Sequence, residues 1–247
     1  MNRALHDAND AMRAGLESLG DKAAEKFAAV KPRLRGWLHL CLTPLALAGG
    51  IVLVVLSPTA TTRVGSAVFA LSALLLFGVS AIYHTGTWSP RVWAFLRRFD
   101  HANIFVLIAG TYTPLTLMLL EGTQRVVLLT TVWSCAVLGV LFRVFWTDAP
   151  RWLYTPLYIG LGWAAVFFIP GFVDGANAVL STGVGITVLV LVAAGGLLYT
   201  IGAVVYGFKR PDPWPEWFGF HEIFHTFTIL AFISHYVGVS IATYSLR

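Results

Sequence analysis

Charged side chains are scarce in this sequence. Asp, Glu, Lys and Arg make up 12% of the 247 residues, whereas soluble domains carry about 25%. Apolar residues supply 57% of the chain, and the mean hydropathy is +0.74. This composition excludes an ordinary soluble globular domain and predicts an integral membrane protein.

Cysteine is scarce as well. The two cysteines, Cys41 and Cys135, fall inside apolar segments, so we expect free buried thiols and neither a disulfide framework nor a cysteine-based metal site. No basic run with interleaved aromatic residues is present, and we therefore expect no nucleic-acid partner.

The first 35 residues are polar, which is unlike a cleavable signal peptide.

Long apolar runs are what the sequence has instead. A helix needs about 20 residues to cross a bilayer, and seven segments approach or exceed that length. They cover roughly residues 36–56, 65–86, 101–120, 126–146, 151–170, 182–208 and 218–242. The predicted fold class is an all-α membrane protein, with a seven-transmembrane helix bundle as one domain over residues 36–247.

Lysine and arginine are unevenly distributed between the ends of these segments. Fourteen of them lie in residues 1–35 or in the connections after the second, fourth and sixth segments, against Arg63, Arg125 and Arg247 on the other side. The positive-inside rule then predicts a multi-pass protein of the inner (plasma) membrane, with its N-terminus in the cytoplasm and its C-terminus outside. The net charge of +5 follows from this asymmetry.

Residues 1–35 form a separate N-terminal segment. Leu5, Met12, Leu16 and Leu19 recur at helical spacing between charges of both signs, a pattern typical of an amphipathic helix. Such a cytoplasmic helix could lie on the membrane surface or stand in solvent, and the mixed charges favour neither.

A pair of histidines opens the last apolar segment, which reads FGFHEIFHTFTILAFISHY over residues 218–236. His221 and His225 are four residues apart, so both imidazoles leave the same face of a helix. This is the spacing of metal ligands. Hydrogen bonds between helices are the structural alternative for histidines inside a membrane.

Further polar residues lie at the same predicted membrane level. The second segment ends with Ser80 and His84, four residues apart, and the third begins with Asp100 and His101. Because the second segment runs inward and the third and seventh run outward, all of them share one layer with the histidine pair. The structural alternatives are packing and back-bonding for Ser80 and a helix cap for Asp100.

Three imidazoles with one open position are typical of a catalytic zinc site, which lowers the pKa of a bound water to about 7. The predicted metal ligands are His84, His221 and His225. Asp100 would orient or deprotonate the attacking water, and Ser80 would steady that carboxylate or donate to a developing oxyanion.

The string from His221 to His225 also matches the HExxH pattern, in which the glutamate is the general base of a zinc protease. An intramembrane metalloprotease would carry a further aspartate ligand in a late helix, and the late segments lack one. Glu222 is therefore kept as a candidate base behind Asp100.

Three other histidines are given lesser roles. His101 points about 100° away from Asp100 on a helix and is the less favoured ligand. His39, one turn inside the first segment, is interpreted as an interfacial residue. His235 lies about 15 Å deeper than His225 by helical rise; a structural hydrogen bond is expected there, or a lining of a substrate or proton path.

At these residues the sequence resembles a known family. The resemblance is carried by AIYHTG, DHANIFVLIAGTYTP and HEIFH with its distal histidine, and it covers roughly residues 36–242. These motifs resemble the bacterial hemolysin III branch of the progestin and adipoQ receptor family, which includes the adiponectin receptors. The resemblance places the family's zinc ligands on the three predicted histidines, its water-binding aspartate on Asp100 and its serine on Ser80. It also implies a cytoplasmic N-terminus.

Three function classes follow. Eukaryotic relatives are linked to ceramide hydrolysis and the wider superfamily includes alkaline ceramidases, which implies a zinc-dependent hydrolase of lipid amide or ester bonds. Its partner would be a membrane lipid whose acyl chain enters the bundle. The second class is a non-enzymatic receptor or regulator of membrane state with structural zinc. The name of the bacterial branch implies the third, a pore-forming hemolysin (cytolysis), although nothing in the chain resembles a secreted lytic protein.

Overall fold

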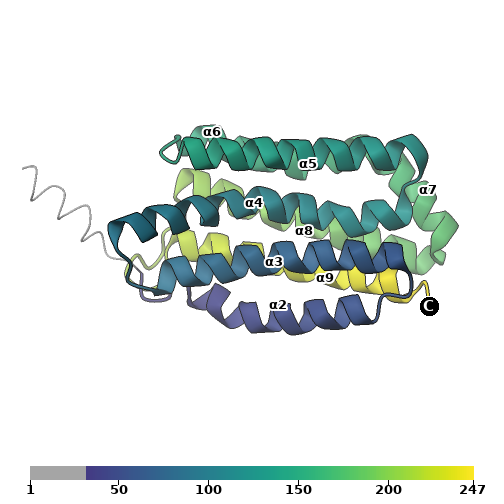
Figure 1. The fold of residues 1–247 in the computed structure, drawn as a ribbon, viewed down its shortest axis with the longest axis horizontal. Helices are drawn as coiled ribbons and strands as arrows, with labels where there is room; N and C mark the ends of the chain where they lie inside the picture. The colour runs from purple at the N-terminus through teal and green to yellow at the C-terminus, as the bar shows by residue number, and fades with distance from the viewer. Residues whose placement is uncertain (1–31) are drawn as a thin grey trace, which may run out of the picture.

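The computed structural model of the protein describes residues 32–247, and the amphipathic helix predicted within residues 1–35 lies outside this range. The described residues form long helices joined by short connections (Figure 1). In chain order these are α2 (Trp37–Val55), α3 (Ala60–Thr85), α4 (Pro90–Leu119), α5 (Gly122–Phe145), α6 (Arg151–Gly162), the 3-10 helix η1 (Ala164–Phe168), α7 (Ile169–Val179), α8 (Thr182–Phe208) and α9 (Phe220–Tyr244).

Within the described residues, seven stretches of helix are long and apolar enough to cross a membrane. They are α2, α3, α4, α5, α8, α9 and the continuous stretch from α6 through η1 to α7. The predicted all-α bundle of seven apolar helices is confirmed. Two boundaries differ most from the prediction: α4 begins at Pro90 rather than near residue 101, and the fifth stretch continues to Val179 rather than ending near residue 170.

The early start of α4 changes the position of Asp100. Pro90 lies in the first turn of the helix, where a missing N–H removes no helical hydrogen bond. The turns that follow contain Arg91, Arg97 and Arg98, whose charges lower the hydropathy and conceal the helix in the sequence. Asp100 therefore lies well inside α4, and the structural alternative considered for it, a helix cap, does not apply, because the N-cap residue is Ser89.

The fifth span is interrupted by η1. Pro170 has no N–H, so a continuous α-helix through this point would lose a hydrogen bond. Tyr112 of α4 supplies the missing partners: its hydroxyl accepts a hydrogen bond from the Ala165 N–H at 3.0 Å and donates to the Gly162 carbonyl at 2.6 Å. Irregular backbone at membrane depth is tolerated where the protein satisfies it, and Tyr112 provides this here.

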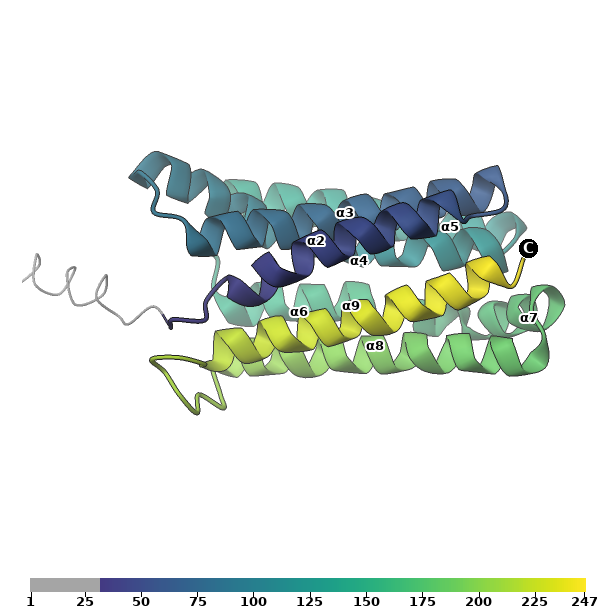
Figure 2. The same cartoon turned by 90° about the horizontal axis from the view of Figure 1, so that it is seen from below.

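The central helix of the bundle is α4. Of its most apolar stretch 72% is buried, against 11% for the stretch from α6 to α7. In Figure 1, α5 and α6 lie along one side of α4, with α3 and α2 along the other. The view from below shows α9 beside α8, with α2 next to it (Figure 2). Cys41 and Cys135 are free thiols on the outside of the bundle, so the prediction that they are buried is wrong.

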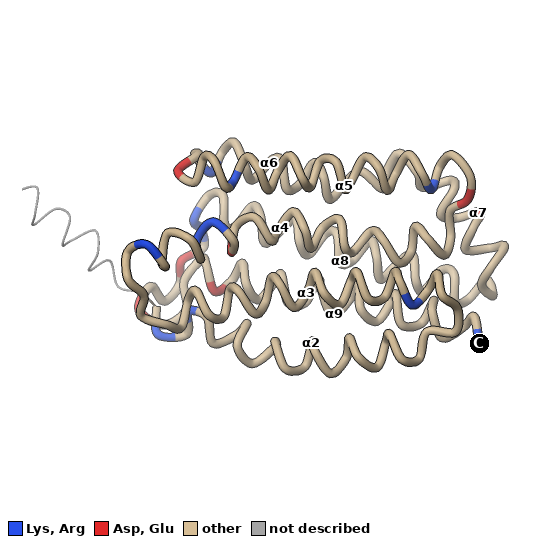
Figure 3. The backbone as a smooth tube through the Cα atoms, in the orientation of Figure 1, with Lys and Arg blue, Asp and Glu red and all other residues tan. Residues whose placement is uncertain are grey.

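Basic residues gather at one end of the bundle, where α2, α4, α6 and α9 begin (Figure 3). We call this the basic end. The opposite end carries Arg63, Arg125 and Arg247. The polar residues singled out in the sequence lie toward the basic end, at the end of α3, in the first half of α4 and at the start of α9.

Replacing Tyr112 with Phe should destabilise the bundle by about 1–3 kcal/mol, because the Ala165 N–H and the Gly162 carbonyl would lose their partner at membrane depth. Tyr199→Phe is the matched control, since the Tyr199 hydroxyl is buried and has no hydrogen-bond partner within residues 32–247. Thermal unfolding in detergent measures both. An unchanged midpoint for Tyr112→Phe would contradict the role given to this hydroxyl.

Candidate metal centre

The start of α9 is fixed by two carboxylates. Gly219 is the N-cap residue, and its N–H donates to Glu222 Oε2 at 2.9 Å. The Phe220 N–H donates to Asp212 Oδ1, also at 2.9 Å. Carboxylates are favourable at the N-terminus of a helix, which carries a partial positive charge. These caps fix the rotation of α9 and hence the directions of the histidines in its first two turns.

The chain entering α2 is tied to this same point. The Arg35 Nε donates to Glu222 Oε1 at 2.8 Å, and the Glu222 side chain is almost fully buried. The Arg33 N–H donates to the Glu216 carbonyl at 2.9 Å. A buried carboxylate is costly unless it is paired and hydrogen-bonded, and here both of its oxygens accept. The segment before α2 is thereby held against the start of α9.

Gly36 follows directly and touches the end of α3. Its φ of 87° lies in the left-handed region, which glycine adopts without steric cost. A Cβ at this position would lie 2.6 Å from His84 Cβ. Only a residue without a side chain fits between the entry to α2 and His84, so Gly36 sets how closely α2 approaches the site.

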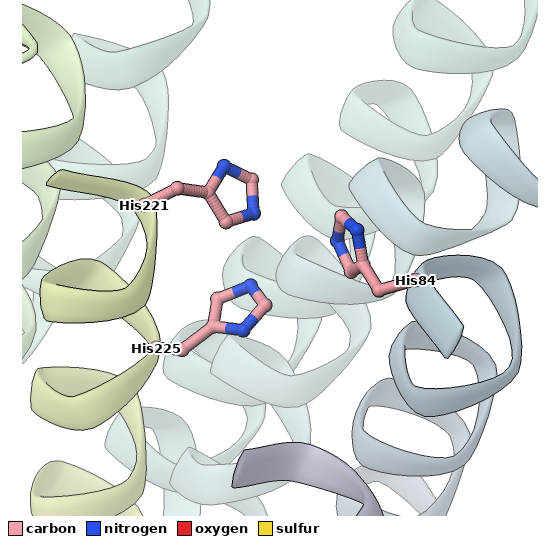
Figure 4. A group of neighbouring side chains, drawn as sticks. All are labelled: His84, His221 and His225. Atoms are coloured by element: carbon pink, nitrogen blue, oxygen red, sulfur yellow. The ribbon is translucent and has the colours of Figure 1, made fainter. Parts of the chain in front are cut away.

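Three histidines converge in this region (Figure 4). His221 and His225 project from the first turns of α9, and His84 projects toward them from the last turn of α3. One nitrogen of each ring can be chosen so that all three lie within 4.8 Å of one another. We call this group the histidine triad. The spacing of His221 and His225 and their predicted level with His84 bring these rings together as expected.

The donor atoms of the triad fit a metal ion. Nε2 of His84 and Nε2 of His221 are buried and have no hydrogen-bond partner among the described residues. Buried polar atoms in proteins nearly always have a hydrogen-bond partner or a ligand. These two nitrogens are therefore free to bind a ligand that the described residues do not supply. Imidazole suits divalent transition metals. The triad could therefore hold a metal ion.

Asp100 and Ser80 lie beside the triad. Asp100 Oδ2 is 3.7 Å from Nε2 of His84 and 3.7 Å from Nδ1 of His101. Ser80 lies one turn before His84 on α3, and its hydroxyl is buried without a partner in the part of the chain that the structure describes. Both residues line the same cavity as His221 and His225. As the sequence predicted, a carboxylate and a hydroxyl lie at the same level as the candidate ligands and next to them.

Glu222 and His101 are engaged elsewhere. Glu222 lines neither of the two cavities that adjoin the triad, and its two oxygens accept hydrogen bonds from Arg35 and Gly219. Acting as a base would require it to give up both partners. His101 Nδ1 lies 2.8 Å from the Arg97 carbonyl, so this nitrogen is already hydrogen-bonded.

His39 is the residue that the sequence reasoning missed. It is 2% exposed, and its ring stacks on that of His225 with 3.9 Å between centroids and 10° between planes. Neither of its ring nitrogens has a hydrogen-bond partner within residues 32–247. The interpretation of His39 as an interfacial residue is wrong. Its level, one turn inside the first segment at the basic end, was the signal that could have placed it with the others.

A cavity of about 470 Å³ extends from the triad into the bundle, within the usual size of ligand pockets, roughly 300–1,000 Å³. We call it the apolar cavity, because most of its lining is apolar. It reaches Leu119 at the far end of α4 and passes His235, whose Nδ1 lies 2.8 Å from the Ala231 carbonyl. Trp163 and Leu197 line it as well and are exposed on the outside of the bundle. The cavity thus reaches the outer surface between the fifth span and α8.

Within residues 32–247, seven apolar helices and a histidine triad with two buried members define a multi-pass membrane protein with a candidate metal centre. The model of the family described as haemolysin-III related matches residues 27–236. The chain belongs to this family, and the resemblance drawn from the motifs is confirmed. Family and fold together are consistent with the plasma membrane of a bacterium.

Relatives include bacterial and animal proteins. The chain is 36% identical to the hemolysin-3 homolog of Bacillus subtilis (strain 168) over 162 residues, which are 66% of this chain and 69% of that protein. It is 32% identical to hemolysin-3 of Bacillus cereus over 69% of this chain and 71% of that one. The adiponectin receptor protein of Drosophila melanogaster is 27% identical over 70% of this chain and 41% of its own length.

Replacing Gly36 with Ala should weaken metal binding although Gly36 offers no ligand. The added Cβ would collide with His84, and misplacing a ligand typically lowers metal affinity about 10–100-fold. Gly122→Ala is the control: Gly122 also has a positive φ, 51°, but nothing lies within 4 Å of its added Cβ. Competition with a chelating dye measures the affinity. Equal losses in both variants would mean that backbone strain and not contact with His84 is responsible.

Proposed function

We propose that this protein is a zinc-dependent hydrolase of lipid amide or ester bonds. The observation that carries the proposal is the histidine triad, with its ligand atoms within 4.8 Å of one another, at the head of the apolar cavity. A carboxylate, a hydroxyl and a hydrophobic channel around one candidate metal centre are the parts that a lipid hydrolase needs.

Zinc is the ion that the donor set favours. Three neutral imidazoles with an open fourth position are the ligands of catalytic zinc sites. A zinc ion held there would supply Lewis acidity, polarising the scissile carbonyl and lowering the pKa of bound water to about 7. His39, stacked on His225, packs against one ligand and limits how its ring can turn.

Asp100 is the group that would move the proton. Its carboxylate faces the triad at 3.7 Å from His84 Nε2, and in hydrolysis it accepts a proton from the attacking water and passes it to the leaving amine or alcohol. The bond that breaks is the one between the acyl carbon and that nitrogen or oxygen. The free hydroxyl of Ser80 donates a hydrogen bond to the carbonyl oxygen as negative charge develops on it.

The apolar cavity suits the acyl chain of the substrate. Asp100 and Leu119 both line it, and nineteen residues of helix between them span about 28 Å. An acyl chain lying along α4 would place its carbonyl at the triad, and the exposed lining residues offer entry from the lipid. The basic end faces the cytoplasm by the positive-inside rule, so the reaction would take place near the cytoplasmic leaflet.

Metal content tests the site itself. Detergent-purified native protein should hold about one zinc per chain, because three imidazoles bind it. His225→Ala should lose the metal, whereas Asp100→Ala should keep it, since Asp100 is assigned a role beside the metal and not as a ligand. Elemental mass spectrometry of the three proteins gives the answer. Native protein without metal would refute the zinc site.

Turnover tests the enzyme. Zinc-loaded protein should release fatty acid from an N-acyl amide, a ceramide or a glycerolipid, and Asp100→Asn should reduce the rate about 10²–10⁴-fold, the usual contribution of a general acid–base, with zinc content unchanged. Mass-spectrometric detection of the free fatty acid measures both. Metal-loaded native protein that turns over none of these lipids would contradict the hydrolase assignment.

A second candidate is a membrane receptor or regulator with structural zinc. The observation in its favour is that the triad joins one residue of α3 to two of α9, so a bound ion would brace two helices. Asp100→Asn separates the two candidates, because a purely structural ion would leave phenotype and stability of that variant close to native, whereas His84→Ala would impair both.

A further inference from the structure

A second cavity, of about 720 Å³, lies at the basic end next to the triad. We call it the basic vestibule. Its charged lining residues are Arg35, Arg97, Arg143, Arg151, Lys209 and Asp148. Five cations therefore face one carboxylate. A cavity with such an excess of one sign concentrates ions of the opposite sign.

Two of these cations are already neutralised. Arg35 pairs with Glu222 at 2.8 Å, and Arg97 pairs with Asp148 at 3.0 Å. Within residues 32–247, no carboxylate oxygen lies within ion-pairing distance of Arg143 or Arg151. The fifth cation, Lys209, has no ion pair among these residues either, but it is exposed to the surroundings. The unneutralised charge inside the vestibule is therefore that of the two guanidinium groups.

Arg143 is buried, unlike an arginine that merely follows the charge bias of membrane proteins. Such an arginine keeps its head in water or among headgroups, but Arg143 is 1% exposed. Its NH1 makes a long hydrogen bond of 3.4 Å to the Trp146 carbonyl, and its Nε has no partner in the described chain. A guanidinium has five N–H donors, so most of those of Arg143 are unused.

The two arginines rest on adjoining tyrosines. The Arg143 guanidinium carbon lies 4.3 Å from the ring centroid of Tyr154, and that of Arg151 lies 4.5 Å from the ring centroid of Tyr206. The two tyrosine hydroxyls are 3.3 Å apart. Cation–π contacts of this kind return less free energy than desolvating a charge costs. An anion bound between the two arginines would compensate for the difference.

The floor of the vestibule is also the entrance to the apolar cavity. Tyr154, Tyr206, His101 and His221 line both cavities, and His221 belongs to the triad. A molecule with an anionic head and a hydrocarbon chain can place the head against the arginines and the chain in the apolar cavity, with the triad between them. Two guanidinium groups match the planar, multidentate recognition of a phosphate group.

We infer that Arg143 and Arg151 form a phosphate-binding site in the basic vestibule, which takes the phosphate headgroup of a lipid whose chain occupies the apolar cavity. As a binding site it stands without any catalysis. If the proposed hydrolase function holds, this phospholipid is also the substrate. The phosphate site then restricts the substrates of the hydrolase to lipids with an anionic head.

The experiment compares three ligands that differ only in whether they carry the phosphate head, the hydrocarbon chain or both. Monooleoylglycerol phosphate carries head and chain, monooleoylglycerol lacks the phosphate, and glycerol phosphate lacks the chain. Binding to the full chain in a neutral maltoside detergent is measured by native mass spectrometry. The phosphorylated lipid should bind at least about tenfold more tightly than the neutral one, as expected for hydrogen bonds between charged groups.

Arg143→Gln should remove this preference, lowering affinity for the phosphorylated lipid about tenfold or more and leaving that for monooleoylglycerol unchanged. Arg151→Gln should act in the same direction and serves as the second variant if Arg143→Gln fails to fold. Arg125→Gln removes the same charge at the opposite end of the bundle and should change neither affinity.

The outcomes separate the alternatives. Binding of glycerol phosphate that is lost in Arg143→Gln would identify a soluble phosphate compound as the ligand in place of a lipid. Equal affinity of native protein for the two lipids, or an equal loss in Arg125→Gln, would overturn the site. Retained preference in metal-free His225→Ala, together with no hydrolysis by zinc-loaded native protein, would refute the proposed function while leaving the phosphate site standing.

Discussion

The geometry of the site depends on the contacts of one buried group, the carboxylate of Glu222. One of its oxygens caps α9 at Gly219 and the other accepts from Arg35 at 2.8 Å. The first bond fixes where α9 begins, and the second holds the entry of α2 against it. Gly36, the next residue, then meets His84 on α3. A single charge therefore links the positions of the three helices that carry His39 and the histidine triad.

The triad lies where two environments of opposite character meet. The apolar cavity leads away from it along α4, and the basic vestibule opens from it at the charged end, with His221 in the lining of both. A bilayer has the same order, with charged headgroups outside and hydrocarbon inside. The interior of the protein thus has the same order of polarity as the membrane. The lipid proposed as ligand would keep a charged environment around its head and an apolar one around its chain when it binds.

The sequence predicted the parts that follow from local pattern. Hydropathy located seven spans, and the spacing of His221 and His225 placed two rings on one face. The charged residues before Asp100 concealed the start of α4, because a hydropathy average does not detect the polar first turns of a helix. The role of His39 was wrongly predicted because its partner, His225, is far away in the sequence. Only the packing of α2 against α9 brings the two rings together.

The match to the HExxH pattern shows how a motif can be present without the geometry that gives it meaning. The pattern has its mechanism when both histidines bind the metal and the glutamate stands free beside it. Here the two histidines belong to the triad, but Glu222 caps the helix and pairs with Arg35, so neither of its oxygens is free. Asp100, contributed by a different helix, faces two imidazoles at 3.7 Å. In the proposed hydrolase, the carboxylate that transfers the proton is therefore the one that the tertiary fold brings to the triad, and not Glu222, which lies between His221 and His225 in the sequence.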